Sequence, residues 1–180
     1  MYTETEVSGV KIAIIYATKS GTTRECAHLL ARQLNNHDVS VLNVSEVDSL
    51  DGYDTAVLGF PIRMGRALKS ARRFMKNNSD ALCRLHASYF ICCGFIDCFE
   101  EYAQKSIPIA CRESTTAVSC FGGRLDPSQV KGFDKIVVKA VRDEILGGGD
   151  NGDQRDDMVL PTILDENIVQ FAEQIKSCEK

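Results

Sequence analysis

The stretch KIAIIYATKSGTTR, residues 11–24, decides the fold of this chain. Residues 12–16 are apolar and rich in β-branched side chains, which predicts a strand buried on both faces. Residues 17–23 form a small loop rich in hydroxyl groups, and apolar side chains then recur at helical spacing over residues 24–34. Because a helix begins with unpaired N–H groups and the positive end of its dipole, this order predicts a site for an anion.

Two other kinds of phosphate loop do not fit this stretch. A Walker loop needs Gly-Lys-Ser/Thr at a fixed distance after an earlier glycine, and the loop has no such pair. A dinucleotide-binding loop needs three glycines, and only Gly21 is present. The competing interpretation is an ordinary turn in which a Ser or Thr side chain caps the helix. The loop taken alone leaves both interpretations open.

The length and composition of the chain predict one globular domain over residues 1–180. The sequence has 44% hydrophobic and 26% charged residues, and its net charge of −4 does not suit a protein that coats nucleic acid. Residues 1–9 carry acids and no apolar core, which predicts a frayed leader and no signal peptide. No apolar run approaches the roughly 18 residues that a membrane span needs, so no span is expected. The cytoplasmic location that we expect rests on the cysteines described next.

The eight cysteines predict buried thiols and no metal centre. None of them forms a C-x-x-C pair, and the three histidines have no ligand spacing, so neither a zinc nor an iron–sulfur site is expected. Most of the cysteines stand in apolar runs, where a thiol behaves as a small hydrophobe. This usage is typical of a reducing cytoplasm.

Strand-like and helical segments alternate along the chain. Strands are expected at 12–16, 39–44, 55–60, 86–94 and 115–121, and helices at 24–34, 67–76, 100–107, 127–145 and 165–176. This alternation predicts an α/β fold with a five-stranded parallel sheet. Ligands of such sheets lie beyond the carboxyl ends of the strands, so the loops after the first, third and fourth strands should converge on one crevice.

The spacing Thr18-x-Ser20-Gly21-x-Thr23 resembles the phosphate loop of flavodoxins, and the order of elements resembles the flavodoxin fold over residues 11–176. The resemblance implies a three-layer flavodoxin-like fold with sheet order 2-1-3-4-5 and FMN as the cofactor. A flavin also needs flat surfaces against its ring and backbone groups near its ring nitrogens, and the two other loops are placed to supply them. The cofactor contacts expected on this basis are Thr18, Lys19, Ser20, Gly21, Thr22 and Thr23, then Pro61, Ile62, Arg63, Met64 and Gly65, and then Cys93, Gly94, Phe95 and Asp97.

Two further segments are similar to the menaquinone-dependent protoporphyrinogen oxidases of bacteria. They are GYDTAVLGFPIRMGR at residues 52–66 and FGGRLDP at residues 121–127. The resemblance implies oxidation of a porphyrinogen with electrons passed to a quinone. Two features depart from these patterns. The chain has no Trp, and offers Met64 and Phe95 where carrier flavodoxins commonly stack an aromatic ring. The loop after the fourth strand is also shorter than the insertion of the oxidases.

The segment that follows the third expected strand, residues 63–76, is strongly basic. Its cations, with no acid before Asp80, are Arg63, Arg66, Lys69, Arg72, Arg73 and Lys76. Helical spacing predicts one shared face for Arg66, Lys69, Arg73 and Lys76. A basic rim would attract an anionic substrate, such as a porphyrinogen, or an acidic redox partner. A plain solvated helix face is the alternative interpretation. Arg63, on the loop itself, is the candidate for a substrate or flavin contact.

Other roles stay open as alternatives. Asp97 is the carboxylate nearest the crevice loops, but an aspartate that caps its own loop explains it as well, so the catalytic residues are unknown. The predicted helix over 129–145 carries lysines beside its apolar stripe. It would either pack on the sheet or rest on a membrane surface as a peripheral contact.

Three functions therefore compete. The first is an FMN-dependent oxidoreductase that resembles protoporphyrinogen oxidase and uses a quinone as acceptor. The second is a soluble electron carrier between redox partner proteins. The third is a non-redox α/β module that binds another phosphate.

Overall fold

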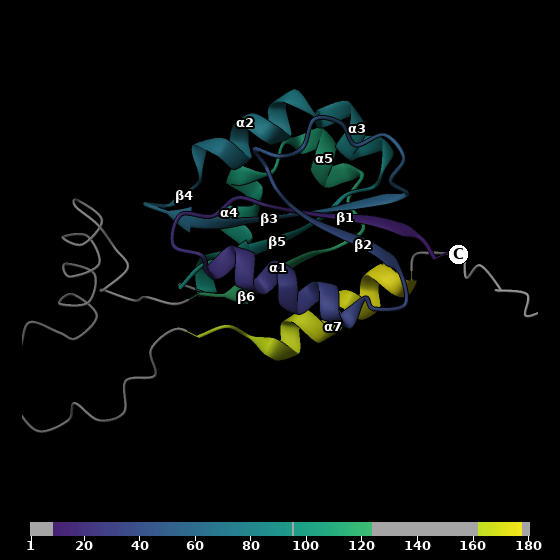
Figure 1. Ribbon diagram of the computed structural model, residues 1–180. Coiled ribbons are helices and arrows are strands. Elements are labelled where there is room, and N and C mark those ends of the chain that lie inside the picture. Colours follow the sequence, from purple (N-terminus) through teal and green to yellow (C-terminus); the bar gives the residue numbers. More distant parts are fainter. Residues whose placement is uncertain (1–8, 95, 124–161, 178–180) are drawn as a thin grey trace, which may run out of the picture.

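The computed structural model describes residues 9–94, 96–123 and 162–177, and these residues are built around one twisted sheet (Figure 1). Its strands are β1 (Lys11–Tyr16), β2 (Asp38–Asn43), β3 (Thr55–Arg63), β4 (Arg66–Ala67), β5 (Ser88–Cys92) and β6 (Val118–Gly122). The main path runs β2-β1-β3-β5-β6 with every pair parallel, which confirms the predicted fold and strand order. The additional strand β4 lies off this path and pairs antiparallel with the end of β3.

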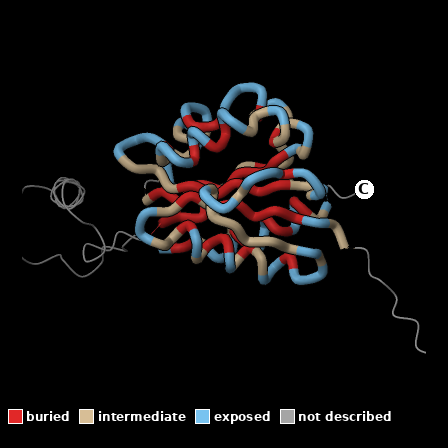
Figure 2. The backbone as a smooth tube through the Cα atoms, turned by 45° about the horizontal axis from the view of Figure 1, so that its top comes forward, coloured by how far each residue is buried: buried red, intermediate tan, exposed pale blue. Residues whose placement is uncertain are grey.

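Strand β1 lies inside the sheet and is buried on both faces. It pairs with β2 and with β3, and the side chains of Ile12, Ala13, Ile14 and Ile15 are fully buried. The strand is apolar without alternation because helices cover both faces of a parallel sheet. Figure 2 shows the same pattern, with buried residues along the strands and exposed residues on the outer turns of the helices.

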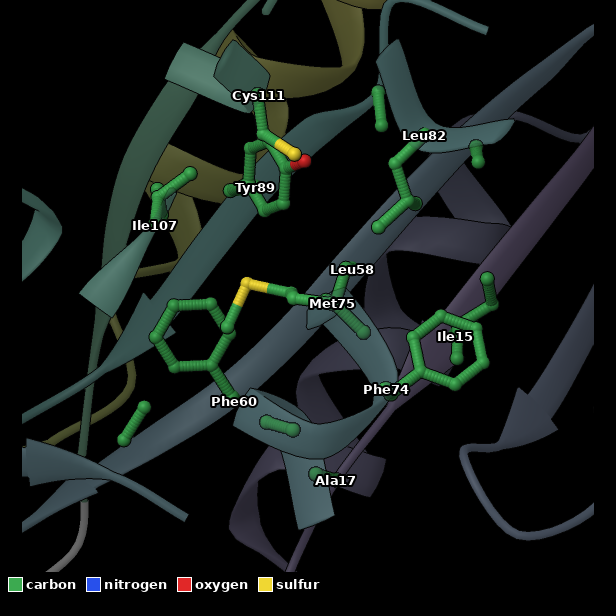
Figure 3. Packing of buried hydrophobic residues seen from close by; sticks show 14 of the residues in the cluster. Ile15, Ala17, Leu58, Phe60, Phe74, Met75, Leu82, Tyr89, Ile107 and Cys111 are labelled. Carbon is green, nitrogen blue, oxygen red and sulfur yellow. The ribbon is translucent and has the colours of Figure 1, made fainter. Parts of the chain in front are cut away.

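Helices form the two outer layers. On one face lie α1 (Thr22–Gln33) and α7 (Asp165–Ser177); on the other lie α2 (Lys69–Asn77), α3 (Ser79–Arg84), α4 (Phe99–Ser106) and α5 (Ile109–Glu113). Each layer encloses its own apolar cluster against the sheet. Figure 3 shows part of the cluster under α2, with Phe60, Met75 and Tyr89 among its members.

A column of rings fills the other cluster. The ring of Phe90 stacks on Phe121 with centroids 4.5 Å apart, and Phe121 meets Phe171 of α7 edge-on at 5.3 Å. Phe90 lies beside Gly59 in the parallel register of β3 and β5. A Cβ atom built on Gly59 would come within 1.9 Å of the Phe90 ring. A glycine at position 59 therefore makes room for the first ring of the column.

Residues 162–164 lie directly beside the end of β6. The N–H of Gly123 donates to the carbonyl of Thr162 at 3.2 Å, and the N–H of Leu164 donates to the carbonyl of Phe121 at 3.1 Å. The side-chain amide of Asn167 adds a bond of 2.7 Å to the carbonyl of Cys120. These bonds fix the start of α7 to the last strand.

Several predicted boundaries were wrong. Strand β3 runs to Arg63 and not to residue 60, because the chain turns back as a hairpin into β4. The helix expected at 67–76 consequently begins at Lys69.

The fourth strand is shorter than 86–94, since residue 86 has a φ of +46° and ends a turn. The short helices α3, α5 and η1 (Ile96–Cys98) were not predicted. The helix expected at 127–145 lies outside the described residues.

The contact between Gly59 and Phe90 predicts a mutational coupling. We expect Gly59→Ala to lower the free energy of unfolding by about 1–3 kcal/mol, because the added methyl group overlaps a ring that is held by Phe121. Urea denaturation measures the loss. The double variant Gly59→Ala/Phe90→Leu should lose less than the sum of the two single variants. Additive losses would show that the methyl group and the ring do not compete for the same space.

Candidate functional site

The ends of the parallel strands gather the three predicted loops at one side of the sheet. Tyr16 lies beside Gly59, Pro61 lies beside Cys92, and Cys92 lies beside Gly122, so these strands end together. We call this side the carboxyl edge of the sheet. The loops that follow β1, β3 and β5 all leave from it, and in Figure 1 the start of α1 and β4 lie at the same end of the molecule. The three loops therefore leave from one edge of the sheet, as the sequence predicted.

Two hydrogen bonds hold the first loop in place, one to a side chain of the loop and one to the backbone of β3. The hydroxyl oxygen of Thr18 accepts the N–H of Gly21 at 2.9 Å, and the N–H of Ala17 bonds the carbonyl of Gly59 at 2.9 Å. Gly21 precedes α1 as its N-cap with a φ of +95°, and no side chain caps the helix. The alternative of a Ser or Thr cap is thus wrong, and the first-turn N–H groups of α1 face the loop without a side-chain cap. Lys19 and Ser20 are exposed on the loop.

Thr23 in the first turn of α1 is fully buried, and its hydroxyl oxygen has no hydrogen-bond partner among the described residues. The hydroxyl lies near enough to the Cys92 thiol to oppose the rise in that thiol's pKa, which is driven first by a hydrogen bond with Cys26 and then by burial. A buried hydroxyl without a partner costs about 1–3 kcal/mol. Position 23 therefore holds a polar group that is enclosed in the protein beside the Cys92 thiol and makes no regular hydrogen bond among the described residues.

The second loop is a tight hairpin. Arg63 pairs with Arg66 across a turn of two residues, Met64 and Gly65, whose φ values are +51° and +71°. Two central residues with positive φ are the pattern of a type I′ turn, which favours Asn, Asp or Gly at both positions. Met64 does not suit this conformation, and its side chain is nevertheless 68% exposed at the tip. The hairpin thus combines backbone strain with an exposed apolar side chain.

The third loop leaves β5 beside a pair of thiols. The Sγ atoms of Cys93 and Cys120 are 3.5 Å apart, and the N–H of Gly122 donates to the sulfur of Cys120 at 3.5 Å. The hydrogen bond with Cys93 lowers the pKa of Cys120 to about 7, aided by backbone N–H groups and opposed by burial. Asp97 is exposed in η1, Gly94 is half-buried, and Phe95 lies outside the described residues. The pairing of Cys93 with Cys120 was missed because it depends on how β5 and β6 are aligned.

The basic segment lies beside the second loop. Arg63 is half-buried at the end of β3, Arg66 is exposed on β4, and the remaining cations project from α2. The prediction that Arg66 belongs to the helical face is wrong, because α2 begins only at Lys69. Arg66 nevertheless stands between the hairpin tip and the first turn of that helix.

Comparison with known families identifies this arrangement. Residues 13–151 match the family described as Flavodoxin domain. The chain belongs to the flavodoxin domain family. No curated protein matches the sequence.

Two solved flavodoxins share the fold. The flavodoxin of Fusobacterium nucleatum bound to flavin mononucleotide aligns over 94% of this chain and 99% of its own, with 14% identity and a TM-score of 0.52. Oxidised Flavodoxin 2 from Bacillus cereus aligns over the same shares, with 18% identity and a TM-score of 0.50. Among the described residues no helix is long and apolar enough to cross a membrane.

The strained hairpin predicts that an unfavourable residue stands at position 64. We expect Met64→Asn to raise the free energy of unfolding by about 1 kcal/mol, because Asn tolerates a positive φ in a type I′ turn better than Met does. Urea denaturation of both proteins checks this difference. Val169→Asn is the control, since it removes a side chain that is 44% exposed from the regular helix α7 and should bring no gain. An equal gain in both variants would show that turn strain is not the cause.

Proposed function

We propose that this chain binds FMN at the carboxyl edge and transfers electrons between redox partners. The observation that carries the proposal is the start of α1 in a flavodoxin fold, which has no side-chain cap and opens onto free space at Gly21. The N–H groups of the first helical turn have no side-chain acceptor there, and a bound anion would supply acceptor oxygens. The solved relative with bound flavin mononucleotide supports FMN as the source of that anion.

The first loop fits a phosphate group. A Cβ built on Gly21 meets no atom within 4 Å, so there is open space at the helix start. The hydroxyl of Thr18 already accepts one N–H and still has its own proton to donate. Together with the backbone N–H groups, the phosphate would be held by Thr18, Lys19, Ser20, Gly21, Thr22 and Thr23.

The flavin ring would lie between the second and third loops. Pro61, Ile62, Arg63, Met64 and Gly65 would form one wall, and Cys93, Gly94, Phe95 and Asp97 the other. When bound, FMN supplies the ability to accept and donate one or two electrons. The residues of this chain hold the ring and limit the access of water to it. In this arrangement Met64 would cover the ring from the hairpin, in place of an aromatic side chain.

Electron transfer is preferred over the two other functions. Membership of the flavodoxin domain family and the fold of the solved flavodoxins support a carrier at least as well as an oxidase. Oxidation of a porphyrinogen with a quinone acceptor remains the second candidate, and the observation that favours it is the placement of Arg63 beside the proposed ring site. A non-redox phosphate module would leave the second and third loops without a role.

The proposal predicts that removal of the Thr23 hydroxyl weakens FMN binding without a loss of stability. Thr23→Val should weaken FMN binding about tenfold or more. The FMN-free protein should keep its stability, because the lost hydroxyl makes no regular hydrogen bond in it and only a weak contact with the Cys92 thiol. Quenching of FMN fluorescence measures the affinity, and urea denaturation measures the stability. Thr55→Val, at the opposite end of β3, is the matched control and should leave FMN affinity unchanged.

Two results would decide against the proposal. A purified protein that is colourless and does not quench added FMN would remove the flavin altogether. Oxidation of a porphyrinogen with a menaquinone analogue, at a rate clearly above that of free FMN and reduced in Arg63→Glu, would replace the carrier by the oxidase.

A further inference from the structure

The exposed charged residues of α2 are all cations. Ala71, Phe74 and Met75 are buried against the sheet. Lys69, Arg72, Arg73 and Lys76 are exposed and, at 3.6 residues per turn, lie within an arc of about 100° on the opposite side. Arg66 on β4 extends this row toward the hairpin tip. We call these five residues the basic face.

The cations of the basic face are not neutralised by the described part of the chain. None of the five takes part in an ion pair there, whereas Arg84 pairs with Asp51 at 3.3 Å and Lys176 pairs with Glu173 at 2.8 Å. Helix α2 has no acidic residue in its first turn, where Lys69 instead meets the positive end of the dipole. This placement is mildly unfavourable for the helix. A solvated surface helix would gain stability from mixed charges, so the row of like charges favours an external anionic partner.

The basic face borders the proposed electron-transfer site. It starts at β4, which pairs with the end of β3 at the carboxyl edge, and Figure 1 shows α2 running from β4 across the top of the sheet. The exposed Met64 lies at the tip of the same hairpin. An apolar side chain beside a charged surface is the composition of a small protein interface, in which Met is enriched.

The rest of the chain has a negative net charge, opposite to that of the basic face. Without the five cations of the basic face, 16 basic and 25 acidic residues remain, a net charge of −9. A partner with a negative surface would be repelled by most of this protein and attracted by the basic face. Such asymmetry orients an encounter and raises the association rate.

We propose that the basic face is the docking surface for an acidic redox partner protein. The proposal rests on the function proposed above, since it names the kind of partner that would meet the flavin. The side chains stand on a convex helix and spread over about 10 Å, which suits a protein surface better than a small anion that needs converging donors. A membrane surface is a less suitable partner, because a helix that binds lipid needs a broad apolar face. Beside the basic face only one apolar side chain, that of Met64 at the hairpin tip, is exposed among the described residues.

The first test measures binding without the flavin. The probes are a mitochondrial-type cytochrome c, which is basic, and its succinylated form, which is acidic and has the same fold and haem. At about 10 mM ionic strength, calorimetry should show that the protein binds the succinylated probe at least about tenfold tighter than the basic one. This preference should weaken as salt screens the charges.

Charge reversal locates the surface. Lys69→Glu/Arg73→Glu should remove the preference for the acidic probe. The control is Lys11→Glu/Arg32→Glu, which makes the same change in net charge at exposed positions on β1 and α1, away from the basic face. This double variant should keep most of the preference for the acidic probe. A preference for the basic probe in the unchanged protein, or equal effects of the two double variants, would overturn the proposal. Tighter binding to vesicles rich in phosphatidylglycerol than to the acidic probe would also overturn it.

The second test separates docking from the proposed function. The FMN-loaded protein, reduced with dithionite, should pass electrons to the succinylated cytochrome faster than to the basic one in stopped-flow measurements. Reduction of both probes at equal rates would retain electron transfer and reject the docking surface. Charge-selective binding without FMN uptake or electron transfer would reject the proposed function and retain the surface.

Discussion

The parallel pairing of β1 with β2 and with β3 is the constraint on which the rest of the structure depends. Parallel neighbours cannot be joined by a tight turn, so the chain must cross over a face of the sheet between one strand and the next. The helices that make these crossings cover both faces, which explains why β1 is buried from Ile12 to Ile15 without alternation. The same pairing brings the ends of the main strands to one edge, so the crevice loops meet there.

Several departures from ordinary local chemistry lie at this edge, and another, the positive φ of His86, lies at the opposite edge before β5. Gly21 and Met64 have positive φ, the Thr23 hydroxyl is buried without a partner, and Cys120 holds its proton less firmly than a usual thiol. The interior below it follows packing rules closely, as the column from Gly59 to Phe171 shows. The departures at the carboxyl edge stand where a bound ligand would be able to offset their cost.

The sequence predicted best those features that are local. The strand, hydroxyl loop and helix at residues 11–34 were recognisable because each follows from neighbouring residues, and the strand order followed from the family resemblance. The hairpin was missed because the apolar spacing from residue 67 onward fits a helix as well as the two-residue strand β4. The thiol pair of Cys93 and Cys120 depends on the register of two strands that are distant in sequence, and no local pattern encodes such a register. Of the three loops expected at the site, the first was predicted in most detail, because consecutive residues carry its chemistry.

The hydrogen bond between Gly123 and Thr162 has a consequence for the length of the chain between them. It holds two points 39 positions apart in the sequence next to each other, beside the last strand and at the carboxyl edge. The entropy of closing a loop between two such points grows only slowly with the length of the loop, so a change in that length costs little free energy of folding. A change in the number of residues between these two points is therefore compatible with an unchanged order of the described strands.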